Sequence, residues 1–146
     1  MIRPLLVLAA ATASCSPPAS CAEDIRAQRL DERVTVAVGE LELAAELADE
    51  QSERERGWMH RRCDLEALLL VPDAAGGELP VWGCALTTAL DVVFVRDDEV
   101  VALDRLDPCP EPCGACPRVG VGLPVDAVLE VPHGEYALEV GARVTW

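Results

Sequence analysis

The chain has 146 residues, a hydrophobic content of 51% and a formal net charge of -14. This length allows one domain with a core of its own, and the scarcity of aromatic residues means that aliphatic side chains must fill the core. Nucleic acids bind to basic faces, so the acidic balance excludes them as partners.

The N-terminus has the organisation of a secretory signal. Arg3 precedes an apolar run over residues 5–13, which is much shorter than the about 20 residues that span a bilayer. Residues 12–15 then resemble a lipobox, the small-residue stretch that ends in the cysteine receiving lipid, although Thr12 departs from the usual aliphatic residue. We therefore expect a signal segment over residues 1–14 and a lipid on Cys15. The alternative is ordinary cleavage after Ala13, which would release a soluble protein.

The segment after Cys15 fits an anchored protein. Residues 16–20 are rich in proline and serine, so we interpret residues 15–30 as a tether. The protein is then expected to be exported to the cell envelope, where its lipid holds it at a periplasmic or cell-surface membrane. Besides the membrane, an envelope partner or small ligand is expected, which the sequence does not identify.

Residues 31–146 are interpreted as a single β-rich domain. Val34, Val36 and Val38 alternate with other residues as in a half-buried strand, and residues 40–47 continue the period of two after Gly39. Further strands are predicted over residues 67–71, 81–86, 91–95, 100–103 and 125–131, with a hairpin turn at 96–99 and a last strand at Val144.

One short helix is predicted between the second and third strands. Asp49 would cap it, Glu50 and Arg54 would pair four residues apart, and Gly57 would end it. A single helical turn is expected over residues 135–138. The sum is an α+β, mostly β domain, a compact barrel-like or sandwich-like sheet of roughly seven strands with one short helix.

The chain has seven cysteines, an odd number for an exported protein. Lipid on Cys15 would leave six, which an oxidising compartment would convert to disulfides. These candidates are Cys21, Cys63, Cys84, Cys109, Cys113 and Cys116. Their connectivity is left open, because six cysteines can pair in many ways.

Three of the six, Cys109, Cys113 and Cys116, lie in one proline-rich loop. The spacing of the last two is also that of a dithiol redox motif, but such a motif caps a helix and none is predicted here. The same thiols together with His60 or His133 could bind a metal. We favour structural disulfides and keep a thiol–disulfide or metal-binding protein as the alternative.

Four stretches carry a resemblance to a known family. In chain order they are Glu-Arg-Gly-Trp-Met-His-Arg at 55–61, Leu-Leu-Leu-Val-Pro at 68–72, Trp82 with Leu-Asp-Val-Val-Phe-Val at 90–95, and Ala-Val-Leu-Glu-Val-Pro at 127–132 with Gly134, Gly141 and Val144. This order resembles the uncharacterised bacterial family called domain of unknown function 192, over about residues 43–144. The resemblance implies a compact, β-rich fold and no established activity.

One departure from the family pattern follows Trp82. The family carries Met-Lys-Asn-Thr there, whereas this chain has Gly83, Cys84, Ala85 and Leu86. If the lysine and asparagine bind something in relatives, this protein has lost that property or does something else. Cys84 is a candidate to pair with one of the loop cysteines.

The candidate pocket residues are Met59, Arg61, Trp82 and Asp91, which belong to the family-like stretches. Structural roles compete for them: core packing for Trp82, an ion pair for Arg61 and capping of backbone amides for Asp91. We assign no catalytic residue, cofactor or metal ligand, since the sequence has no nucleophile motif or phosphate-binding loop. His60 is the best general-base candidate if the protein is an enzyme. We favour a non-enzymatic ligand- or partner-binding module stabilised by disulfides.

Overall fold

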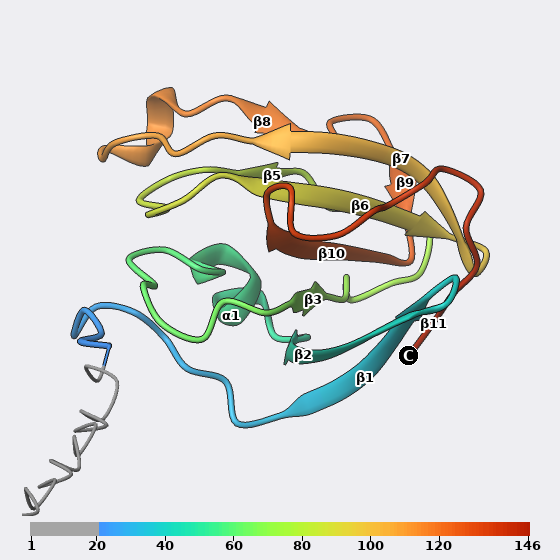
Figure 1. Cartoon of the computed structure of the whole chain (residues 1–146). Coiled ribbons are helices and arrows are strands. Elements are labelled where there is room, and N and C mark those ends of the chain that lie inside the picture. The colour runs from blue at the N-terminus through green and yellow to red at the C-terminus, as the bar shows by residue number, and fades with distance from the viewer. Residues whose placement is uncertain (1–20) are drawn as a thin grey trace, which may run out of the picture.

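The computed structural model describes residues 21–146, so the predicted signal segment, Cys15 and the start of the tether lie outside the described residues. The elements are β1 (Arg33–Val38), β2 (Leu41–Ala48), α1 (Gln51–Arg56), β3 (Leu68–Leu70), β4 (Gly77–Glu78), β5 (Val81–Trp82), β6 (Leu90–Arg96), β7 (Glu99–Leu106), the 3-10 helix η1 (Cys113–Ala115), β8 (Arg118–Val119), β9 (Pro124–Val125), β10 (Ala127–Pro132) and β11 (Val144–Thr145) (Figure 1). No helix in this described part is long and apolar enough to cross a membrane.

A curled sheet of seven strands dominates the domain, in the order β11-β1-β2-β3-β10-β6-β7. All its pairings are antiparallel except the parallel pair β2–β3. The two edges approach each other through the segment that leads into β11. There the Val100 amide donates to the Ala142 carbonyl at 2.9 Å, and the Val144 amide donates to the Asp98 carbonyl at 2.8 Å. These bonds nearly close the sheet, as in a barrel.

The central strands are buried on both faces, because the sheet separates two apolar cores. All seven strands contribute to the first core, which is therefore the interior of the curled sheet; its members include Val36, Leu43, Leu69, Val93, Val100, Leu129 and Val144. The second core lies on the other face and includes Trp58, Leu68, Leu70, Val92, Phe94 and Val128. Burial on both faces explains why β3, β6 and β10 are almost continuous apolar runs.

The residues in the two hairpin turns have the backbone conformations that tight turns require. Gly39 takes a φ of 61° in the two-residue turn between β1 and β2. Asp97 and Asp98 take φ values of 52° and 59° in the turn between β6 and β7. Two successive positive φ values are typical of the turn type whose twist matches paired strands. The predicted hairpin at residues 96–99 is confirmed.

The short helix is confirmed, but its capping residue is not Asp49. Glu50 is the N-cap, and it exchanges hydrogen bonds with Glu53 in a capping box. Arg54 does not pair with Glu50, because its guanidinium reaches Asp73 at 2.8 Å and the Val71 carbonyl at 2.9 Å instead.

Two other local predictions were wrong. Residues 135–138 form no helical turn, since Tyr136 and Leu138 pack against the first core. The strand predicted over residues 81–86 stops after Trp82, because the carbonyl of Gly83 accepts a hydrogen bond from Cys109 at 2.8 Å. The predicted mostly β, barrel-like domain with one short α-helix is nevertheless confirmed.

Candidate functional site

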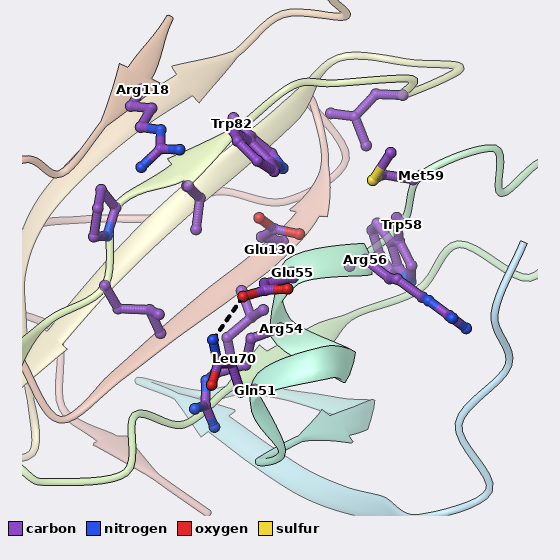
Figure 2. A pocket seen from close by; sticks show the side chains of 15 residues that line it. Gln51, Arg54, Glu55, Arg56, Trp58, Met59, Leu70, Trp82, Arg118 and Glu130 are labelled. Carbon is purple, nitrogen blue, oxygen red and sulfur yellow. Dashed lines mark hydrogen bonds between the residues drawn. The ribbon is translucent and has the colours of Figure 1, made fainter. Parts of the chain in front are cut away.

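A cavity of about 300 Å³ opens between α1, the second core and the β5–β8 ribbon. We call it the Glu130 cavity, after the residue on β10 that reaches it from the sheet (Figure 2). Its walls are mainly apolar and include Trp58, Met59, Leu70, Val81, Trp82 and Leu86. Its polar rim is formed by Gln51, Arg54, Glu55, Arg56 and Arg118.

Glu130 is the one carboxylate that comes from the sheet rather than from the rim. Its neighbours in register are Leu68 on β3 and Val92 on β6, both fully buried. The side chain is 4% exposed, and it makes no hydrogen bond or ion pair with any described residue. Burial raises the pKa of Glu130 from 4.5 to about 8. The group is therefore mostly protonated at neutral pH while the cavity has no partner for it.

The glycine that ends α1 lies beside this carboxyl group. Gly57 has a φ of 44°, and a Cβ at this position would lie 3.9 Å from Glu130 Oε2. The positive φ disfavours any other residue here. The turn then continues into Trp58, which is 2% exposed and whose Nε1 has no hydrogen-bond partner among the described residues.

Trp82 and Arg118 form the opposite wall. They are register partners in the β5–β8 ribbon, and the guanidinium carbon lies 4.6 Å from the centroid of the Trp82 ring. This is a cation–π contact on an aromatic wall of the cavity. Figure 2 shows the Glu130 carboxyl group directed from the sheet toward the space between Trp82 and α1.

Two of the four predicted pocket residues, Met59 and Trp82, line the Glu130 cavity. Arg61 lies elsewhere and is 1% exposed. Its guanidinium binds Glu46 at 2.6 Å and donates to the carbonyls of Cys63 and Gln28 at 2.8 and 2.9 Å. These contacts satisfy the charge within the protein, so Arg61 holds the turn after α1 and the preceding segment together.

Asp91 also lies away from the Glu130 cavity, at the start of β6. It accepts hydrogen bonds from the Gly134 amide at 2.8 Å and from His133 Nδ1 at 2.6 Å. Arg105 donates to His133 Nε2 at 2.9 Å, so both ring nitrogens are engaged. Asp91 therefore caps the turn after β10. His60 lies 3.8 Å from the Glu111 carboxylate and does not line the Glu130 cavity.

The cysteines of the described residues are all paired. The three disulfides are Cys21–Cys63, Cys84–Cys113 and Cys109–Cys116. Cys84 thus joins the loop, as the departure from the family pattern suggested. In residues 21–146, no group of three or more His, Cys, Asp or Glu is placed to hold a metal ion. A metal or dithiol site on the loop would require that these disulfides first be reduced.

The family of the chain follows from comparison with known proteins. The family called DUF192, described as "Uncharacterized ACR", matches residues 34–146. The chain belongs to this family. The resemblance found in the sequence is confirmed, and every residue that lines the Glu130 cavity lies within this DUF192 domain.

Solved structures similar to this DUF192 protein share its fold. A protein of unknown function from Novosphingobium aromaticivorans has a TM-score of 0.68 and 23% identity, with 94% of this chain and 100% of the other covered. A candidate transcription regulator from Sinorhizobium meliloti has a TM-score of 0.62 and 23% identity, covering 81% of this chain and 96% of that one. No curated protein matches the chain. At this identity the likeness establishes the fold alone.

Sequence reasoning did not single out Glu130, Trp58 or Arg118. A signal for Glu130 was present, because it is the one charged residue within the apolar run of β10. A strand buried on both faces has no solvent side for a carboxylate, so such a residue must face a partner or a cavity. No comparable local signal marks Arg118, whose position depends on pairing between distant segments.

Proposed function

We propose that this protein is an exported, lipid-anchored envelope protein whose DUF192 domain binds a small molecule in the Glu130 cavity. The supporting observation is the conjunction of an apolar cavity with a buried carboxyl group that has no partner among the described residues. Ligand sites are typically concave and mostly apolar, with a few polar groups that orient the ligand. The volume of about 300 Å³ suits a molecule of modest size.

The presence of a carboxyl group among apolar walls supports ligand binding, rather than core packing, as the role of Glu130. Burying a carboxyl group that has no hydrogen-bond or charge partner among the described residues costs free energy, so folding alone gains nothing from it at this position. Leucine or valine there would extend the apolar pattern of β10 and fill space in the second core. Pairing with a ligand would explain why a glutamate stands at this position, whereas a contribution to folding stability would not.

Export and anchoring are supported by separate features. The apolar run at residues 5–13 and the lipobox-like residues ending at Cys15 are those of a lipoprotein signal. Three disulfides are in keeping with an oxidising compartment outside the cytosol. The lipid would hold the cavity near the membrane surface.

The binding proposal is tested by recovering the ligand. The full chain is purified from its native envelope, denatured, and the released small molecules are identified by mass spectrometry. Leu86→Trp should fill part of the cavity and lose the molecule. Leu103→Trp makes the same change at an exposed position on β7 and should keep it. The proposal is wrong if no molecule is released from the unaltered chain, or if both variants retain it equally.

The anchoring proposal has its own test. Mass spectrometry of the N-terminal peptide from the envelope protein should show acyl chains on Cys15 as the first residue. A peptide that begins at Ser14 without lipid would show the soluble alternative instead.

A further inference from the structure

The charges around the Glu130 cavity distinguish among possible ligands. Four charged groups line it in addition to Glu130: Arg54, Glu55 and Arg56 from α1, and Arg118 from β8. Neither histidine lines it. The ligand's charge is therefore set by which of these groups is left without a partner and faces the enclosed space.

The arginines of the rim are occupied or point elsewhere. The Arg54 side chain is 7% exposed and is held by Asp73 and the Val71 carbonyl. Arg56 runs past Trp58, away from Glu130 (Figure 2). Arg118 is exposed and lies over the Trp82 ring. Of the charged groups that line the cavity, Glu130 is the one that is both buried and without a hydrogen bond or ion pair to any residue of 21–146.

We propose that the ligand is a small organic cation, an ammonium or guanidinium group on an apolar body, whose charge pairs with Glu130 while the body lies against Trp58 and Trp82. This inference rests on the proposed function and specifies its ligand class. The apolar body replaces water along walls that are already hydrophobic. The cation supplies the charge-assisted hydrogen bonds that the carboxylate lacks.

The aromatic walls favour the same sign of charge. A positive group near an indole ring is attracted by the electrons of its face. Arg118 already covers one face of the Trp82 ring at 4.6 Å, so Trp58, which also lines the cavity, is the indole that the ligand's cation can use. An anionic ligand would instead face the carboxyl groups of Glu130 and Glu55, while the lining arginines lie at the rim, where Arg54 already binds Asp73 and Arg118 is exposed.

Binding of a cation has a measurable proton balance. Before a cation binds, burial keeps Glu130 protonated at neutral pH, because it raises the pKa of this carboxyl group to about 8. An ammonium ion pairs with the ionised form, so the Glu130 proton is released to solvent as the ion pair forms. The complex then contains one carboxylate and one ammonium. Affinity should therefore increase as the pH is raised toward 8 and then level off.

The test uses three compounds of equal length on the full chain: n-hexylammonium, 1-hexanol and hexanoate. Isothermal titration at pH 6.5, in two buffers with different ionisation enthalpies, gives both the affinity and the number of protons released. We expect hexylammonium to bind at least about tenfold tighter than hexanol, hexanoate to bind weakest, and close to one proton to be released with the amine.

Two variants then test whether the preference for the amine and the proton release both come from Glu130. Glu130→Gln should remove the preference for the amine and the proton release, and leave hexanol binding unchanged. Glu42→Gln alters an exposed carboxylate on β2 and should change neither. The proton count in the unaltered chain tests the idea even if Glu130→Gln does not fold.

The outcomes separate this inference from the proposed function. If hexanol or hexanoate binds as tightly as the amine, or the amine binds without proton release, the cation assignment is wrong while the cavity still binds small molecules. A neutral or anionic molecule recovered from the native protein would overturn the cation assignment in the same way. If none of the three compounds binds, the cation assignment is likewise wrong, and the absence of any recovered molecule would remove the proposed function as well.

Discussion

Replacing Glu130 by glutamine should make the protein more stable at alkaline pH. Glutamine has nearly the shape of the protonated glutamic acid, and it cannot ionise. At pH 5 the folded protein already holds Glu130 protonated, so the two proteins should unfold at similar urea concentrations. Above the folded-state pKa only the unaltered protein must keep a buried carboxylate without a partner.

The size of the effect follows from the position of the pKa. Burial raises it from 4.5 to about 8, so the folded state binds this proton more tightly than the unfolded state does. The contribution of Glu130 to stability is fully present below pH 4.5 and is lost as the pH rises through about 8. Each pH unit in that interval changes the folding equilibrium about tenfold, which amounts to about 5 kcal/mol in all.

Urea unfolding of both proteins, with their disulfides intact, should be measured from pH 5 to pH 9. The difference between them isolates Glu130, because His60, His133 and the other titrating groups are common to both. We expect the difference in unfolding free energy to grow with pH to several kcal/mol and then level off. If the unfolding free energies of the two proteins change with pH in parallel from pH 5 to pH 9, Glu130 is not a buried carboxyl group without a partner. A saturating cation in the cavity should flatten the curve of the unaltered protein.

Two further substitutions test the packing that supports the site. Arg61→Met should cost about 3 kcal/mol in unfolding free energy, because it removes the buried guanidinium from the Glu46 carboxylate and leaves the exposed Arg33 as the remaining ionic partner. Restoring stability with an added Glu46→Gln change would confirm the cause, and a loss below about 1 kcal/mol for Arg61→Met alone would contradict it. Gly83→Ala should cost about 3 kcal/mol, since a Cβ there would collide with the Asp107 carbonyl oxygen. Gly114→Ala meets nothing within 4 Å and should leave the thermal midpoint almost unchanged; equal shifts for the two glycines would disprove the close contact.

The main strands were predictable because their patterns are local. The alternation of Val34, Val36 and Val38 indicates a strand with one buried face. The continuous apolar runs of β3, β6 and β10 indicate strands that are buried on both faces. The Asp97–Asp98 turn was predictable for a similar reason, since short polar residues tolerate the positive φ that the hairpin requires.

The rest depends on contacts between distant parts of the chain. The two-residue strands β4 and β8 exist only through pairing with segments far away in sequence, so no local period marks them. Residues 135–138 favour a helix locally, but burial of Tyr136 and Leu138 against the first core overrides that preference. The cavity itself could not be predicted, because it requires α1, β10 and the β5–β8 ribbon to meet in space.

The disulfide connectivity could not be predicted from the sequence either, because it also depends on which distant segments meet in space. Spacing alone makes Cys113 and Cys116 the natural neighbours, yet each pairs with a more distant cysteine. The bond between Cys84 and Cys113 joins the end of β5 to η1, so it fixes the loop next to the Trp82 wall.

The Cys21–Cys63 disulfide decides how mechanical load would enter the domain. Cys21 lies six residues after Cys15, and an extended chain covers at most about 3.6 Å per residue. A lipid on Cys15 would thus keep this disulfide within about 22 Å of its attachment point. Tension from the membrane would pass through the covalent S–S bond into the turn that Arg61 holds, instead of pulling β1 out from between β11 and β2. The short tether would keep the domain close to the membrane. Its cavity would then stay in the layer of solvent next to the lipid headgroups.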